Sequence, residues 1–252
     1  MQLQSSDAII LDVVDLHDYD RIVTFLTRTH GKKRGVARGA RRKYSRFAGQ
    51  LQPLAKVHVT WLEKEQSELV RVSSVELERS PSGLHNDLEG ILLGSYLADH
   101  MLEFAQENEA NDHLFRLLDS TLDALLADVD RALAARYYEA WVLRIAGVFP
   151  APRECPGCGR GLEKREVGLA ERGEGLVCRD CGGGSWRPLA PETVEFLLRI
   201  GNENLMRLQR RSPKAVTLDE VESVCAQVRR SFLQRELKSY RVIRETLAGI
   251  QE

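Results

Sequence analysis

Short apolar runs and stretches of alternating apolar and polar side chains within the first 80 residues are typical of β-strands. Val57, Val59 and Trp61 are the clearest case, because one polar residue separates each from the next, as on a strand with one buried face. The strands expected from this pattern lie within residues 8–14, 22–26, 32–38, 56–61 and 69–77. Five short strands in about 70 residues predict a small barrel of OB-fold size.

Helical spacing replaces this alternation after a turn cluster, Ser-Pro-Ser-Gly, at residues 80–83. Leucine and aromatic side chains then recur every three or four residues, which is typical of amphipathic helices with one buried face. Asn111 is expected to cap the second helix, Gly147 and Pro150 to end the third, and Pro191 to open the next. The expected helices lie within residues 88–102, 114–126, 133–145 and 192–199, in a segment opening with a Thr217–Glu220 capping box, and in a last segment that carries Phe232 and Ile243 and ends near Leu247.

Residues 151–187 interrupt the helical pattern with a stretch rich in Gly, Pro, Cys and charge. The predicted fold class is therefore α+β: an N-terminal OB-fold β-barrel, then a helical domain with an inserted four-cysteine zinc module. The expected divisions are residues 1–80 for the barrel, 81–150 and 188–252 for the helical domain, and 151–187 for the zinc module.

The strongest local motif is a pair of Cys-x-x-Cys sequences separated by nineteen residues. Each can form a turn that points two thiolates at one ion, and two such turns complete a tetrahedron around zinc. A full set of thiolates leaves no position for water, so we predict one structural Zn²⁺ per chain; four reduced thiols without metal are the alternative. The expected ligands are Cys155, Cys158, Cys178 and Cys181, with a short hairpin between the two pairs. The fifth cysteine, Cys225, is expected to be a small core side chain.

The formal net charge of -1 conceals a strong segregation of charge. Residues 21–62 hold eleven Lys or Arg and no Asp or Glu, whereas the other 210 residues hold 25 basic and 37 acidic side chains. A local field of this kind persists even when the whole molecule is near neutral. The barrel is therefore expected to carry a basic surface.

Phosphates attract cations, and single strands also require flat side chains on which bases stack. The basic segment favours nucleic acid as the partner; an acidic peptide of a partner protein and a solvated charged face are the alternatives. Tyr44 is the stacking candidate, since its neighbours are polar, whereas Phe25, Phe47 and Trp61 are assigned to the core. The candidate DNA-binding residues are Lys32, Lys33, Arg34, Arg38, Arg41, Arg42, Lys43, Tyr44 and Arg46.

A cluster of acids could instead bind magnesium and cleave phosphodiesters. Asp12, Asp15, His17, Asp18 and Asp20 form this cluster, but they lie in the connection between two expected strands, where Asp commonly caps turns. The sequence also lacks a phosphate-binding G-x-x-x-x-G-K-[ST] loop, H-E-x-x-H and G-x-S-x-G. We therefore expect no catalytic residue and no enzyme, with a magnesium-dependent nuclease as an alternative.

Several stretches resemble the RecO family of recombination mediators. They are Ala-Ile-Ile-Leu at residues 8–11, residues 20–27 followed by His30-Gly31, residues 36–42, Ser45-Arg46 leading to residues 51–53, the paired cysteines, and residues 237–239. The resemblance spans nearly the whole chain. Where many members of the family have a Gly-Glu pair, this chain has residues 17–20, His-Asp-Tyr-Asp, so no specific role is assigned to that stretch.

The resemblance implies binding of single- and double-stranded DNA, annealing of complementary strands and, with RecR, loading of RecA onto DNA coated by single-strand-binding protein. RecR and the acidic C-terminal tail of single-strand-binding protein are the implied protein partners. No apolar run approaches the roughly 20 residues of a membrane span, and residues 1–7 lack the order of a secretory signal. A cytoplasmic, nucleoid-associated protein with no membrane or small-molecule partner is expected. A zinc-containing transcriptional regulator that reads duplex DNA through residues 151–187 is a further alternative.

Overall fold

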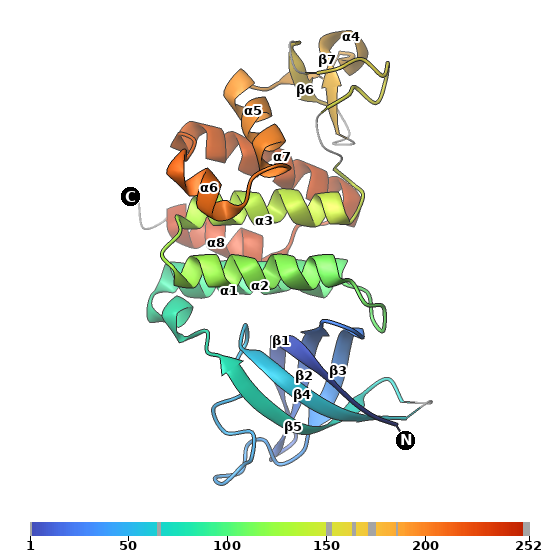
Figure 1. Cartoon of the computed structure of the whole chain (residues 1–252), viewed down its shortest axis with the longest axis vertical. Coiled ribbons are helices and arrows are strands. Elements are labelled where there is room, and N and C mark those ends of the chain that lie inside the picture. The colour runs from blue at the N-terminus through green and yellow to red at the C-terminus, as the bar shows by residue number, and fades with distance from the viewer. Residues whose placement is uncertain are drawn as a thin grey trace. The chain divides into compact units, whose positions relative to one another are not determined.

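The computed structural model in Figure 1 describes residues 2–64, 67–149, 153–162, 165–170, 175–184 and 186–248. Strands fill the N-terminal part and helices most of the rest, which confirms the α+β class. By internal contacts the chain divides into two compact units, Met1–Leu126 with Leu237–Glu252, and Ala127–Glu236. The three-part division expected from the sequence stays a prediction. In the described part of the chain, no helix has the length and apolar character needed to cross a membrane.

The first unit contains a closed five-stranded barrel with the strand order β1-β2-β3-β5-β4. The long first strand pairs with both β2 and β4, and a register shift between Ile10 and Asp12 accompanies its change of partner. Parallel pairing of β3 with β5 completes the barrel, which has the expected OB-fold architecture. The strands are β1 (Gln2–Leu16), β2 (Asp20–Thr27), β3 (Gly31–Ala37), β4 (Lys56–Glu63) and β5 (Val70–Arg79).

Large aromatic side chains fill the barrel as predicted. Trp61 is fully buried, and Phe25 meets it edge-on with 5.8 Å between ring centroids. Phe47 and Leu51 belong to the same core, although both lie in the connection between β3 and β4. This connection is therefore anchored at two points on the barrel interior.

Gly31 forms the tight turn expected between the second and third strands. Its φ of +69° is a left-handed conformation that favours glycine. A Cβ at this position would lie 2.4 Å from the backbone oxygen of Glu109, so the turn packs directly against the segment between the first two helices.

Three helices and one short 3-10 turn share this unit with the barrel. Asn111 caps α2 as predicted, since its side-chain oxygen accepts a hydrogen bond from the Leu114 N–H at 3.1 Å. The C-terminal helix docks on α1, where Asp99 accepts a 2.6 Å hydrogen bond from the Ser239 hydroxyl. These elements are η1 (Ser82–Asn86), α1 (Leu88–Phe104), α2 (Asp112–Leu126) and α8 (Lys238–Ala248).

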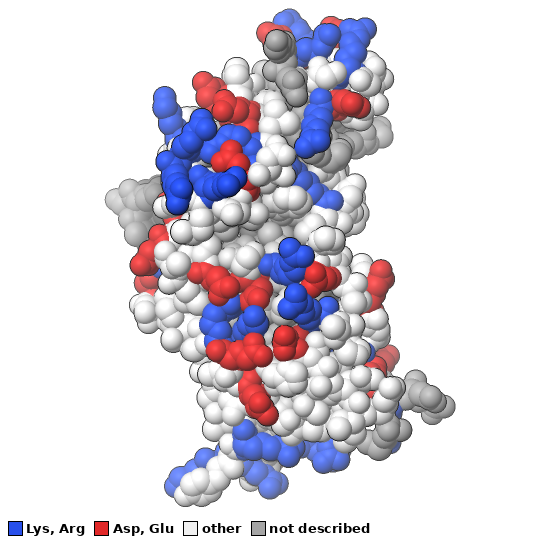
Figure 2. Space-filling model, in the orientation of Figure 1, with Lys and Arg blue, Asp and Glu red and all other residues white. Residues whose placement is uncertain are grey.

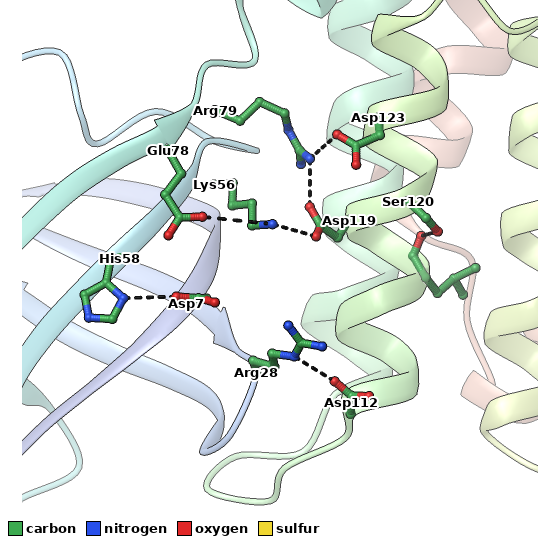
Figure 3. Close-up of polar contacts among 11 residues, drawn as sticks. Asp7, Arg28, Lys56, His58, Glu78, Arg79, Asp112, Asp119, Ser120 and Asp123 are labelled. Carbon is green, nitrogen blue, oxygen red and sulfur yellow. Dashed lines mark hydrogen bonds and ion pairs between the residues drawn. The ribbon is translucent and has the colours of Figure 1, made fainter.

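Ion pairs join the barrel to α2 within this unit, as Figure 3 shows. Asp119 accepts from Lys56 at 2.8 Å and from Arg79 at 2.7 Å. Arg28 pairs with Asp112 at the start of the helix, with 3.1 Å between nitrogen and oxygen. Two cations of the acid-free segment, Arg28 and Lys56, are thereby neutralised by helical carboxylates.

The second unit is helical and carries the small cysteine-containing segment. Its first helix ends before Gly147, whose φ is +74°, and Pro191 lies in the first turn of α5, as expected. Pro150 lies outside the described residues. The helices are α3 (Arg131–Ile145), α4 (Arg179–Gly182), α5 (Pro191–Ile200), α6 (Leu205–Arg210) and α7 (Ala215–Leu233), and the strands are β6 (Val167–Leu169), β7 (Leu176–Cys178) and β8 (Arg187–Pro188).

Two expectations for the C-terminal helices are wrong. The last helix cannot carry both Phe232 and Ile243, because α7 ends at Leu233 and Gln234 adopts a left-handed φ of +57° before α8 begins. Thr217 does not cap a helix, because α7 already begins at Ala215. The short helix α6 was not anticipated, since six residues hold too few turns for a clear period.

Candidate nucleic-acid interface and cysteine cluster

The connection between β3 and β4, residues 38–55, carries most of the candidate DNA-binding residues; we call it the basic loop. Hydrogen bonds hold its first part against the β1–β2 hairpin. The Arg41 N–H donates to the Tyr19 carbonyl at 3.0 Å, and the Gly39 N–H donates to the Asp20 carboxylate at 2.8 Å. The buried side chains of Phe47 and Leu51 hold its second part. The exposed side chains between these anchors thus project from a fixed base.

Four cations of the basic loop are exposed and have no ion pair with any carboxylate in the described residues: Arg38, Arg42, Lys43 and Arg46. Tyr44, between them, is 89% exposed. Figure 2 shows Lys and Arg gathered over this end of the barrel, the lower end of the view. The loop therefore offers positive charge and a flat ring together, which is the pairing that a single strand requires.

Arg41 is also exposed but is partly neutralised. Its Nε lies 3.4 Å from an Asp15 oxygen, and one terminal nitrogen donates to the His17 carbonyl at 3.0 Å. Asp15 also pairs with Arg21 at 3.1 Å. Exposed pairs of this kind contribute about 0–1 kcal/mol, so Arg41 can exchange its partner for a phosphate at little cost.

The acids of the β1–β2 hairpin do not form a metal site in the described part of the chain. Asp15 and Asp20 instead hold the basic loop in place, as described above. Only two described groups bring three or more candidate ligand atoms within 4.8 Å of one another, and neither contains Asp12, Asp15, His17, Asp18 or Asp20.

The three candidate cations on β3 are in different environments. Lys33 is buried and bonded to Glu63 at 2.8 Å, and this hydrogen bond lowers the pKa of the Glu63 carboxyl. Lys32 is half-buried and donates to the Leu102 carbonyl at the end of α1; burial lowers the pKa of its amino group. Arg34 is exposed and has no ion-pair partner among the described residues. Of the three cations, only Arg34 is exposed without an ion-pair partner among the described residues, as Arg38, Arg42, Lys43 and Arg46 of the basic loop are.

Sequence reasoning missed Tyr19, which lies in the turn between β1 and β2. This ring is 55% exposed, and the Arg42 guanidinium lies over it, 5.3 Å from its centroid. The sequence did offer one clue, because an aromatic side chain within the polar turn His-Asp-Tyr-Asp is expected to be exposed to solvent. Its place beside Arg42 follows only from the three-dimensional pairing of the two turns.

The four paired cysteines meet in the second unit. Their sulfur atoms all lie within 4.8 Å of one another, and the Sγ atoms of Cys158 and Cys178 are 3.8 Å apart. A tetrahedron with zinc–sulfur bonds of about 2.3 Å has edges of about 3.8 Å. Gly157 allows the close approach of the two pairs, since a Cβ there would lie 3.0 Å from the Cys181 sulfur. The cluster fits a tetrahedral zinc site.

The expected hairpin between the cysteine pairs is present, because β6 and β7 are antiparallel and buried. Trp186 covers this hairpin and packs against two glycines: a Cβ at Gly168 or Gly182 would lie 2.3 Å or 2.1 Å from its indole ring. This tryptophan and the cysteine cluster therefore both pack around the β6–β7 hairpin.

Backbone donors surround one sulfur of the cluster. Burial by itself raises the pKa of Cys155, but the N–H groups of Cys178, Gly157 and Cys158 outweigh it and lower this pKa to about 6. The neighbouring thiols Cys178 and Cys158 raise the pKa of Cys181. The Cys155 thiol therefore loses its proton more readily than an ordinary cysteine. A bound divalent ion would favour the thiolate form of the other three cysteines as well. The fifth cysteine, Cys225, is fully buried in the core as predicted.

The barrel with its basic loop and the helical unit with its cysteine cluster define an OB-fold protein with a four-cysteine site. Residues 1–81 match the family model described as Recombination protein O N terminal, and residues 85–241 match its C-terminal counterpart. The chain therefore belongs to the RecO family.

Three relatives illustrate the range of similarity. The DNA repair protein RecO of Anaeromyxobacter sp. (strain K) is 35% identical over 199 residues, which cover 78% of this chain and 78% of that protein. The protein of the same name from Geobacter sulfurreducens is 32% identical over 193 residues, covering 77% and 78%. That of Desulforamulus reducens is 28% identical over 241 residues, covering 95% and 93%.

Proposed function

We propose that this protein acts in DNA repair and recombination by binding single- and double-stranded DNA and annealing complementary strands, with no covalent step. Membership of the RecO family and relatives named DNA repair protein RecO support the role. The observation that carries the binding surface is the basic loop, whose exposed cations surround the 89% exposed Tyr44. No described carboxylate neutralises Arg38, Arg42, Lys43 or Arg46.

Annealing requires a surface that screens two polyanions from each other and leaves their bases free to pair. We assign phosphate contacts to Arg38, Arg41, Arg42, Lys43 and Arg46, and base stacking to Tyr44. Arg34 adds a cation on β3. Lys32 and Lys33 contribute to the local field without direct phosphate contact, because their amino groups are held by Leu102 and Glu63.

We further propose that the protein works with RecR to load RecA onto DNA coated by single-strand-binding protein, whose acidic C-terminal tail is a second partner. Family membership supports these partners. The same reasoning assigns the protein to the cytoplasm, in association with the nucleoid.

We also propose that Cys155, Cys158, Cys178 and Cys181 bind one structural Zn²⁺ per chain. The separation of 3.8 Å between two of the sulfurs and the donors around Cys155 support this ion. Four thiolates occupy every tetrahedral position, so the ion would hold the β6–β7 hairpin and α4 together and would supply no reactive water.

A strand-annealing assay tests the proposed function. Labelled complementary strands are mixed with the protein, with and without bound single-strand-binding protein, at increasing salt concentrations. We expect annealing without nucleotide and with a steep decrease as salt rises, because each phosphate contact releases counterions. Absence of annealing at low salt, or cleavage of the strands when magnesium is added, would contradict the proposal.

A further inference from the structure

Three metal-binding residue types converge on the outer face of the barrel, far along the sequence from the cysteines. Asp7 on β1 and His58 on β4 are direct cross-strand partners, and the Asp7 carboxylate lies 3.0 Å from the His58 Nδ1. Glu78 on β5 is the third member. One candidate ligand atom from each lies within 4.8 Å of the others, and Figure 3 shows the three side chains side by side on their strands.

An irregularity in β5 contributes to this arrangement. The pairing of β4 with β5 shifts between Lys56, which faces Arg79, and Val57, which faces Leu77. Glu78 is therefore the extra residue of a β-bulge. Bulges redirect side chains and occur preferentially near functional sites. Here the redirected carboxylate lies beside the Asp7–His58 pair.

A neighbouring lysine does not fill the position that a metal ion would take. The Lys56 amino group is 2.8 Å from Asp119 on α2 but 4.0 Å from Glu78. Asp119 thus holds the competing cation, and Glu78 keeps only a marginal contact with it. A dication placed among Asp7, His58 and Glu78 would meet two carboxylates and one imidazole nitrogen. It would replace the Asp7–His58 hydrogen bond with bonds to the ion and would leave the Lys56–Asp119 ion pair in place.

From this arrangement we propose that Asp7, His58 and Glu78 form a second metal site, specific for a divalent transition-metal ion such as Zn²⁺ or Co²⁺. One imidazole with two carboxylates is a ligand set for such ions, whereas four thiolates define a softer site. Three protein ligands leave coordination positions open to water. The side chains of Asp7 and His58 are 39% and 42% exposed, so the ion has access from solvent and the rigid strands fix its ligands.

Cobalt distinguishes this site from the cysteine cluster. Untagged protein is first loaded with one equivalent of zinc, which thiolates bind more tightly than cobalt, and is then titrated with Co²⁺. We expect one Co²⁺ per chain, with the weak visible bands of nitrogen and oxygen coordination and no strong thiolate charge-transfer band. His58→Asn and Glu78→Gln should each lower the affinity at least tenfold, and added Co²⁺ should raise the melting temperature of the unaltered protein more than that of either variant.

Glu76→Gln is the matched control, because Glu76 is exposed and lies opposite His58 in the register but is not one of the three ligands. It should leave Co²⁺ affinity within about twofold. An equal loss in Glu76→Gln and Glu78→Gln would indicate general attraction of cations and overturn the proposal. Failure to bind Co²⁺ beyond the zinc-loaded cysteines, or a thiolate charge-transfer band, would overturn it as well. Glu78→Gln keeps the test valid if His58→Asn does not fold.

Discussion

The Arg42 guanidinium lies over the ring of Tyr19, 5.3 Å from its centroid. This contact joins the basic loop to the β1–β2 hairpin, alongside the hydrogen bond from the Arg41 N–H to the Tyr19 carbonyl. A cation held over a ring keeps its charge, since the attraction is to the aromatic face and not to a carboxylate. The arrangement therefore orders Arg42 without neutralising it, and places a second exposed ring near the charges.

Reversal of three loop cations should remove most DNA binding. We expect the triple change Arg38→Glu, Arg42→Glu and Arg46→Glu to lower affinity for single strands more than tenfold at moderate salt. The salt dependence of log K should become shallower by about two units, because three phosphate contacts at about 0.7 each are lost. The melting temperature should change little, since all three side chains are exposed. Fluorescence anisotropy across a salt series measures the effect.

The control for this experiment is an equal change of net charge elsewhere. Arg207, Arg210 and Arg211 form another exposed basic group, at α6 in the second unit. Their reversal to Glu should weaken binding less than the loop triple does. If both triples reduce affinity equally, net charge and not the basic loop governs binding.

Removal of the exposed ring should act selectively on single strands. Tyr44→Ala is expected to lower affinity for single strands about five- to a hundredfold, because base stacking on an aromatic ring contributes about 1–3 kcal/mol. Duplex affinity should change much less, since paired bases are not free to stack on it. Tyr44→Phe retains the ring and should behave like the unaltered protein. Equal losses for both kinds of DNA would argue against stacking.

The sequence predicted those parts of the fold that depend on residues close together in the chain, such as β4 and the two turns of the cysteine cluster. The alternation around Val59 marked β4 because its period of two follows from strand geometry alone. The Cys-x-x-Cys turns marked the cysteine cluster because each turn is formed by neighbouring residues. The break at Gln234 escaped prediction, since the apolar spacing continues through it and no glycine or proline marks the left-handed turn.

Charge counting located the basic loop but did not separate paired from unpaired cations. Lys33 shares the inward face of β3 with Gly31, Gly35 and Ala37, all buried, and its partner Glu63 lies thirty residues away on β4. The small residues around it were a usable sign of burial. The ion pair between Arg28 and Asp112 could not be predicted from neighbouring residues, because it depends on where α2 packs against the barrel.

Gly31 should be far more sensitive to substitution than another left-handed glycine of the same unit. Gly31→Ala forces a Cβ to within 2.4 Å of the Glu109 backbone, in addition to a backbone cost of about 1–3 kcal/mol. Gly49 has a φ of +74° and nothing within 4 Å of a built Cβ, so Gly49→Ala should show the backbone cost alone. Denaturant unfolding of both variants gives the difference, which we expect to exceed about 1 kcal/mol. Equal free energies of unfolding would show that the turn does not pack tightly against Glu109.

Zinc removal should disorder the cysteine segment and spare the barrel. Cys178→Ser should abolish zinc binding, since one of four thiolates is lost, and residues 153–189 should then be cleaved rapidly by protease because this segment depends on the metal for its folding. Binding of single strands through the basic loop should persist within about twofold.

Cys225→Ala changes a buried cysteine outside the cluster and should keep one zinc per chain in metal analysis. A zinc content near zero in gently purified unaltered protein would contradict the structural ion. If Cys178→Ser loses DNA binding while the barrel is still folded, the DNA-binding surface lies on residues 153–189 and not on the basic loop.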